Sequence, residues 1–181
     1  MAEGRLCLVV GPSGAGKDSL IAGAAAALAG NPAYLFPKRE ITRAADAGGE
    51  DHIAVGAQEF AARRAGGGYA LAWEAHGLCY GIPASIDDAL ATGKSVVINV
   101  SRTVIETARA RYPRLCVIHV TAPLDILAQR IAARGRETAA DVATRLQRAA
   151  IIAPSGADVV EICNDGRLEE AVEAFVALLR G

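Results

Sequence analysis

Apolar runs of strand length alternate with helical patterns along most of the chain. Continuous apolar runs predict buried strands at residues 5–10, 95–100, 115–120 and 157–163. Helical patterns follow at residues 18–28, 85–91, 103–111, 124–134, 139–150 and 168–179. Buried strands that alternate with helices form parallel sheets with helices on both faces, so the sequence predicts a three-layer α/β fold.

One region interrupts this alternation. Residues 40–83 contain many glycines, short strand-like pieces such as HIAV and YALAW, and one helical run around Phe60. We interpret them as a lobe inserted at the carboxyl ends of the strands, where α/β proteins hold a second substrate. The chain is thus predicted to be a single domain, with its core in residues 1–39 and 84–181 and a substrate-binding lobe in about 40–83.

Composition limits the classes of partner. The chain has 181 residues, 52% of them hydrophobic and 4% aromatic, so it can bury a sizeable, mainly aliphatic core. A net charge of −1 gives no general affinity for nucleic acid or anionic membranes. The longest weakly polar run, LIAGAAAALAG, is too short to cross a bilayer, and no secretory segment precedes it. We therefore expect a cytoplasmic protein without nucleic-acid or membrane partners.

Cysteine and histidine positions indicate neither disulfides nor a metal cage. Cys7, Cys116 and Cys163 fall in strand-like runs, and no C-x-x-C pair is present. Buried free thiols are the simplest interpretation of these three residues. The three histidines are too dispersed to suggest a zinc site.

The most specific motif, GPSGAGKDSL, directly follows the first predicted strand. It nearly matches G-x-x-x-x-G-K-[ST], in which the backbone wraps a phosphate chain and the lysine reaches the β and γ phosphates. The strand before it and the helix after it supply the context that the motif requires. The predicted nucleotide-binding residues of the motif are Gly11, Pro12, Ser13, Gly14, Ala15, Gly16, Lys17, Asp18 and Ser19.

Asp18 stands where this motif usually has a hydroxyl. A carboxylate is a good oxygen ligand for Mg²⁺, directly or through water. Ser19 could supply a hydroxyl instead, but its side chain would point about 100° further round the helix. We therefore predict Asp18 as the ligand of the metal.

Arginines cluster in two segments. Lys38, Arg39 and Arg43 surround the start of the predicted lobe, and five arginines fall in residues 130–148. Arginine binds phosphate oxygens bidentately and keeps its charge, so two such groups suit phosphoryl transfer between two anions. Solvated helix surface is the alternative for the second group, but a hinge-like RGR turn joins its helices. We interpret residues 130–148 as a lid, with Arg134 and Arg145 as its catalytic residues.

Several separated segments resemble the guanylate kinase group of P-loop phosphotransferases. They are GPSGAGK, ITR, AWEAHGLCYG, the arginine-rich lid and ICNDG, which occur in the order of that group and cover nearly the whole chain. The resemblance implies that Arg43 and Tyr80 hold the phosphate of the acceptor. It also implies that lid arginines, including Arg130, close on the transferring phosphoryl group, and that Asn164 lies beside the adenine of ATP.

The departures from that group concern recognition of the base. Guanylate kinases have an acidic residue directly before the tryptophan that corresponds to Trp73 of this chain. This chain has Ala72 at that position. They also have an Asp-x-Asp pair where this chain has Asn99 and Ser101. A polar base edge left without partners typically costs a factor of about 10⁴ in discrimination, so guanine is an unfavourable acceptor.

A chain that has residues to bind the acceptor phosphate, but none to recognise a base, resembles the ribose 1,5-bisphosphate phosphokinase family of phosphonate degradation. The shared segments are GPSG-x-GKDS, ITR, GEDHIAV, CYG, RGRE and NDG, and the resemblance makes Asp18 a mark of that family. It implies transfer of the γ-phosphoryl group of ATP to the 1-phosphate of ribose 1,5-bisphosphate, with ATP and Mg²⁺ as cofactors. The product would be 5-phosphoribosyl 1-diphosphate.

Such an acceptor needs no general base, because its phosphate oxygen is already anionic. Its second phosphate needs another cationic pocket, for which Lys38, Arg39 and Arg102 are candidates. Arg102 could equally cap a strand end or pair with Asp87 or Asp88. For Glu50 and Asn99, a contact to the acceptor and a purely structural role are both open, and Trp73 is interpreted as packing within the lobe.

Two other functions stay open at this point. One is a guanylate or other nucleoside monophosphate kinase, against which the missing acidic residues argue. The other is a non-catalytic guanylate-kinase-like binding module, against which the intact loop at residues 11–17 argues. The sequence is compatible with a homodimer.

Overall fold

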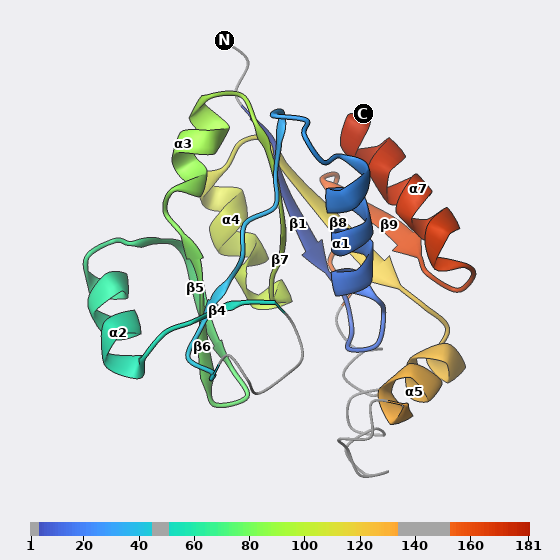
Figure 1. Ribbon diagram of the computed structural model, residues 1–181, viewed down its shortest axis with the longest axis horizontal. Coiled ribbons are helices and arrows are strands. Elements are labelled where there is room, and N and C mark those ends of the chain that lie inside the picture. Colours follow the sequence, from blue (N-terminus) through green and yellow to red (C-terminus); the bar gives the residue numbers. More distant parts are fainter. Residues whose placement is uncertain (1–3, 45–50, 134–152) are drawn as a thin grey trace. The chain divides into compact units, whose positions relative to one another are not determined.

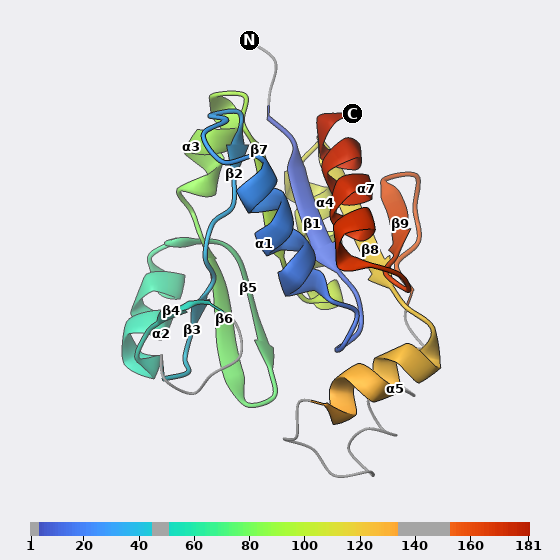
Figure 2. The ribbon, with the colours of Figure 1, turned by 45° about the vertical axis from the view of Figure 1, so that its right-hand side comes forward.

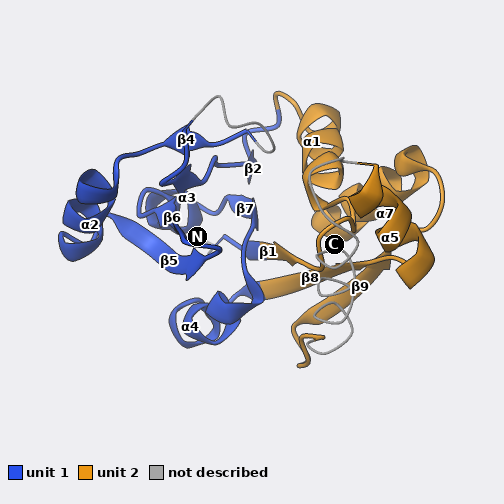
Figure 3. Cartoon of the chain, turned by 90° about the horizontal axis from the view of Figure 1, so that it is seen from below, with its two compact units in different colours: residues 1–7, 31–115 blue, residues 8–30, 116–181 orange. Residues whose placement is uncertain are grey.

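The computed structural model describes residues 4–44, 51–133 and 153–181 (Figure 1). The chain divides into two compact units, coloured separately in Figure 3. Unit 1 contains residues 1–7 and 31–115, and unit 2 contains residues 8–30 and 116–181.

A five-stranded sheet has the strand order β2-β7-β1-β8-β9. Its strands are β1 (Leu6–Val10), β2 (Tyr34–Leu35), β7 (Ser95–Asn99), β8 (Leu115–Thr121) and β9 (Val159–Cys163). β2 pairs with β7 in parallel, and so does β8 with β9. All five residues of β1 are buried, as expected for a strand covered on both faces. The predicted α/β fold with a parallel sheet is confirmed.

Three helices of unit 2 are described: α1 (Lys17–Ala27), α5 (Leu124–Ala132) and α7 (Leu168–Arg180). Helix α7 buries Ala171, Phe175 and Leu179, which recur every four residues and form one apolar stripe. It packs closely on α1, because a Cβ atom at Gly23 would lie 2.5 Å from the Val172 side chain. Among the described residues, no helix is long and apolar enough to span a membrane.

Unit 1 contains a second sheet, with the strand order β4-β3-β6-β5. These strands are β3 (Glu40–Ile41), β4 (Ile53–Ala54), β5 (Tyr69–Ala75) and β6 (Leu78–Pro83). Helix α2 (Ala57–Ala65) lies beside this sheet in Figure 2. All of these elements lie in residues 40–83, the segment that the sequence analysis interprets as a lobe. Unit 1 also holds α3 (Ile86–Ala91), the 3₁₀ turn η1 (Arg102–Val104) and α4 (Ile105–Arg111).

Strands β5 and β6 form a hairpin that the sequence pattern only half predicts. Ala75 pairs with Leu78, so the turn consists of His76 and Gly77, whose φ angles are 52° and 72°. Two positive φ angles are typical of a type I′ turn, which matches the twist of a hairpin. The pattern identified the first strand and missed the second, because the glycine and proline of LCYGIP read as turn signals.

Two further predictions need correction. The helix predicted from residue 103 starts as the 3₁₀ turn η1, where the Ser101 hydroxyl accepts a hydrogen bond from the Thr103 amide at 3.3 Å. Cys163 was expected to be buried but is exposed, because β9 fully buries only Ile162. The helix predicted at residues 139–150 lies outside the described residues.

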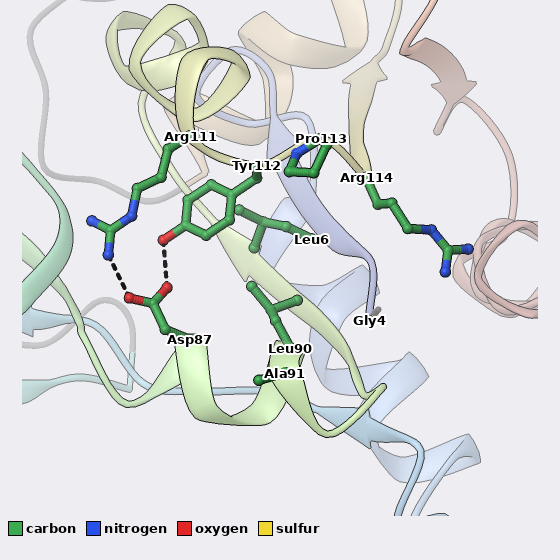
Figure 4. A pocket seen from close by; sticks show the side chains of 9 residues that line it. All are labelled: Gly4, Leu6, Asp87, Leu90, Ala91, Arg111, Tyr112, Pro113 and Arg114. Atoms are coloured by element: carbon green, nitrogen blue, oxygen red, sulfur yellow. Dashed lines mark hydrogen bonds and ion pairs between the residues drawn. The ribbon is translucent and has the colours of Figure 1, made fainter. Parts of the chain in front are cut away.

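A hydrogen-bonded cluster of Asp87, Arg111 and Tyr112 joins α3, α4 and β5 within unit 1. The Asp87 carboxylate accepts hydrogen bonds from the Arg111 guanidinium and, at 2.8 Å, from the Tyr112 hydroxyl (Figure 4). Arg111 Nη1 also donates to the Ala70 carbonyl of β5 at 2.9 Å. The three residues line a cavity of about 290 Å³, which none of the predicted site residues lines.

We expect Asp87→Ala to destabilise the protein by about 1–3 kcal/mol, since it leaves the Tyr112 hydroxyl and an Arg111 nitrogen without their acceptor. Asp88→Ala is the matched control, because Asp88 is the exposed neighbour in the same helical turn and its loss should cost less than about 0.5 kcal/mol. Urea unfolding of both variants measures the difference. Equal losses would contradict a stabilising role of the cluster.

Candidate active site

The phosphate loop links β1 to α1 and requires glycine at defined positions. Gly11, Gly14 and Gly16 have φ angles of 150°, 85° and 88°, which residues with a side chain rarely adopt. A Cβ atom would lie 2.1 Å from the Val120 carbonyl oxygen at position 11 and 2.3 Å from Asn164 Nδ2 at position 16. The spacing of the motif therefore reflects both backbone conformation and lack of space.

Lys17 is the first residue of α1, and its side chain folds back over the loop. Its Nζ atom donates hydrogen bonds to the carbonyl oxygens of Gly11 and Pro12, each at 2.9 Å. The first amide groups of a helix carry partial positive charge and point at whatever lies before the helix. Ammonium and helix end together form a site suited to a phosphate chain.

Asn164 follows β9 and connects three parts of unit 2. Its side chain donates from Nδ2 to the Ala15 carbonyl at 2.8 Å, and its amide donates to the Thr121 carbonyl at 2.8 Å. Its own carbonyl accepts a hydrogen bond from Arg130 Nη1 of α5 at 2.9 Å. The side chain is 3% exposed, and its Oδ1 atom has no hydrogen-bond partner in the described part of the chain. Asn164 therefore braces the loop, and its position beside adenine stays a prediction.

Asp18 and Ser19 are exposed in the first turn of α1. The described residues contain no group of three histidine, cysteine or acidic side chains that could hold a metal. A divalent cation here would therefore need Asp18 together with phosphate oxygens. That donor set fits Mg²⁺, which proteins usually bind through one or two carboxylates and the phosphates of a substrate. Asp18 as the ligand stays a prediction.

Arg39 lies beside Tyr80, another predicted acceptor residue of unit 1. The Tyr80 ring stacks on Trp73, with centroids 5.3 Å apart and planes 5° from parallel. The Arg39 guanidinium lies over the Tyr80 ring, 5.7 Å from its centroid. Trp73 is 7% exposed, in agreement with its interpretation as a packing residue. A cation beside a phenol can bind a phosphate group.

The other basic candidates have different surroundings. Arg43 follows β3 and is half-buried, with its Nε and Nη2 atoms shielded from solvent. Burial lowers the pKa of Arg102, which lies in η1, although an arginine in a protein keeps its charge. Lys38 pairs with Asp51 at 2.8 Å on the surface. Asn99 is the half-buried last residue of β7.

Three of the predicted residues, Arg134, Arg145 and Glu50, lie outside the described residues. Most of the predicted lid, residues 130–148, also lies outside the described residues, and Arg130 is the one arginine of the lid that the structure describes. Their roles stay predictions.

The sequence analysis did not identify a buried carboxylate in β3. Glu40 is 6% exposed and accepts hydrogen bonds from Arg63 Nη1 at 2.7 Å and from the Tyr69 hydroxyl at 2.6 Å. Burial and the bond to Glu40 raise the pKa of Tyr69 well above its ordinary value. The signal in the sequence is slight: a glutamate directly before an apolar residue in a basic segment, KREITR.

No family model matches the chain, but comparisons with known proteins show relatives that match nearly all of it. A ribose 1,5-bisphosphate phosphokinase of Rhizobium etli is 48% identical over 179 residues, covering 99% of this chain and 91% of the relative. One of Burkholderia pseudomallei is 45% identical over 182 residues, covering 100% and 98%. A bifunctional ribose 1,5-bisphosphokinase-thymidine phosphorylase of Cupriavidus pinatubonensis is 51% identical over 98% of this chain, which spans 29% of that longer protein.

Solved structures show the same fold at low identity. A guanylate kinase from Anaplasma phagocytophilum gives a TM-score of 0.67 at 20% identity, covering 99% of this chain and 86% of its own. A gluconokinase from Sinorhizobium meliloti gives 0.52 at 21% identity, covering 98% and 94%. These likenesses confirm the predicted P-loop fold, and the two relatives matched over nearly their full length settle the family. The chain belongs to the ribose 1,5-bisphosphate phosphokinase family.

Proposed function

We propose that the protein transfers the γ-phosphoryl group of ATP to the 1-phosphate of ribose 1,5-bisphosphate, giving 5-phosphoribosyl 1-diphosphate and ADP, in phosphonate degradation. The observation that carries the proposal is the match to phosphokinases of this name over 91% and 98% of their length. The partners would be ATP and a sugar phosphate. A cytoplasmic location and a homodimer stay predictions.

Unit 2 contributes the groups for the phosphoryl donor. Backbone amides of the loop and the start of α1 would hold the β and γ phosphates, while the Lys17 ammonium lies over the same loop. Mg²⁺, when bound beside Asp18, would neutralise charge on the phosphate oxygens. The bond between the γ phosphorus and its bridging oxygen breaks, and the bridging oxygen leaves with ADP.

Unit 1 contributes the candidate groups for the acceptor. Arg43 and Tyr80 would hold the 1-phosphate, and Arg39 and Arg102 would hold the 5-phosphate. An oxygen of the 1-phosphate forms the new bond to phosphorus and already carries negative charge, so no side chain must remove a proton. Positioning and charge neutralisation are then sufficient for catalysis.

The alternative of a guanylate kinase has only fold-level support, from a structure that is 20% identical. Ala72 pairs with Gly81 across the β5-β6 hairpin, so neither position supplies a side chain that could bind a base edge. The non-catalytic alternative is disfavoured by the loop, because Gly11, Gly16 and Lys17 keep the geometry of a phosphate site.

The substrate itself provides the first test of this proposal. In ³¹P NMR with Mg·ATP, we expect a new diphosphate signal when ribose 1,5-bisphosphate is offered, and turnover of GMP to be lower by a factor of about 10⁴. Efficient turnover of GMP with none of the sugar would overturn the proposal and require base-reading groups elsewhere.

Lys17→Ala should lower kcat about a hundredfold or more, because it removes the cation that lies over the loop. The same ³¹P assay measures the rate, and circular dichroism checks that the variant is folded. A folded variant with unchanged turnover would contradict the assignment of the donor site.

Asn164→Ala should raise the KM for ATP about tenfold, since the Ala15 carbonyl loses its donor and the brace of the loop is removed. Asp165→Ala, at the exposed next position, is the control and should leave this KM unchanged. The prediction fails if the two variants bind ATP equally well.

A further inference from the structure

Side chains of the second sheet alternate between two faces. Tyr80 pairs with Ile41 on β3 and with Trp73 on β5, so these three side chains share one face. Glu40 precedes Ile41 and therefore points to the opposite face. Helix α2 covers that face, because its Arg63 side chain reaches Glu40 there.

A β-bulge brings Tyr69 to the same face as Glu40. The register of β5 shifts between Tyr69 and Leu71, which leaves Ala70 as an extra residue. Without the shift, Tyr69 would alternate with Leu71 and Trp73 on the Tyr80 face. With it, the Tyr69 ring lies over Gly81, where a Cβ atom would come within 2.5 Å of the ring. The phenol hydroxyl thereby reaches the Glu40 carboxylate.

Strand β3 has two residues, and backbone bonds at Arg39 and Thr42 extend its pairing to β4 and β6. Such bonds are the same for every side chain, so the side chains on the two faces specify the register. A slip of one residue would turn Glu40 to the Tyr80 face and place Ile41 or Arg39 against Arg63. Arg39 there would oppose a like charge, and Ile41 would leave the Tyr69 hydroxyl without its acceptor. The two bonds to Glu40 are lost in either slipped register.

We propose that Glu40, held by Arg63 and Tyr69, is a positioning residue that fixes the register of β3 and so directs Arg39 to the face of Tyr80. Arg39 precedes Ile41 by two positions, and its guanidinium lies over the Tyr80 ring. In this proposal Glu40 lies on the opposite face, bound to Arg63 and Tyr69, and acts through Arg39. The inference rests on the proposed function, in which Arg39 binds the acceptor.

The test compares the Glu40→Gln variant with the wild-type protein in the ³¹P assay of phosphoryl transfer. A glutamine keeps the length of the side chain, but its carboxamide can accept only one of the two hydrogen bonds and presents an amino group to the other donor. We expect the KM for ribose 1,5-bisphosphate to rise about tenfold, with kcat and the KM for ATP within about twofold of wild type. Calorimetric titration with ribose 1,5-bisphosphate in the absence of ATP should show the same loss of affinity.

Two further variants make the test specific. Glu59→Gln removes the other, solvent-exposed partner of Arg63, at 2.6 Å, and should change neither KM. Tyr69→Phe keeps the ring over Gly81 and removes one of the two hydrogen-bond donors to Glu40, so it should raise the acceptor KM about threefold. This variant replaces Glu40→Gln as the test if Glu40→Gln does not fold.

A purely structural role would lower the melting temperature of Glu40→Gln and leave the ratio of the two KM values unchanged, and this result would overturn the inference. An equal effect of Glu59→Gln would also overturn it. Arg43→Ala and Arg39→Ala separate the two proposals. If neither raises the acceptor KM, the acceptor assignment has failed, whereas if they raise it and neither Glu40→Gln nor Tyr69→Phe does, only the role of Glu40 has failed.

Discussion

The proposed donor site depends on the close approach of backbone to backbone at the phosphate loop. The Val120 carbonyl, at the end of β8, lies where a Cβ atom of Gly11 would be, and Asn164 lies where that of Gly16 would be. The loop is therefore shaped by residues more than a hundred positions away in the sequence. This explains why an anion site made of backbone amides can be rigid: its walls are the ends of neighbouring strands and a buried carboxamide.

In unit 1, the electrostatic problem is to keep a carboxylate in a segment that is proposed to bind phosphate. Glu40 lies between Arg39 and Arg43 in the sequence, and a carboxylate on the face of Arg39 would compete with an anionic acceptor. Its burial against α2 removes that competition, because Arg63 and the Tyr69 hydroxyl neutralise and bind it there. A bulge and a glycine make this arrangement possible, so the cationic face of β3 depends on features of β5 and β6.

The sequence pattern predicted the elements whose residues carry a local signal. The buried strand β1, the glycine loop and the apolar stripe of α7 are each visible in a short window. The strand β6 was missed because its glycine has a role in pairing, under the Tyr69 ring, that no short window contains. The bulge at Ala70 and the pairing of Glu40 are likewise properties of register between strands. For Asn164, resemblance suggested a place beside the nucleotide, and the structure adds its contact with the loop.

With a sugar bisphosphate as the acceptor, the register of β3 matters more than it would in a kinase that recognises a base. A nucleotide acceptor can be oriented by its base as well as by its phosphate, whereas a sugar bisphosphate has only its phosphates and hydroxyls. A slip of one residue moves a strand by about 3.4 Å, and reacting atoms must approach to about 3–3.5 Å. An error of one residue in β3 would thus displace the acceptor phosphate by as much as the whole reacting distance. Backbone hydrogen bonds do not distinguish one side chain from another, so a buried, charged side chain such as Glu40 is a physically reasonable source of specificity for the register.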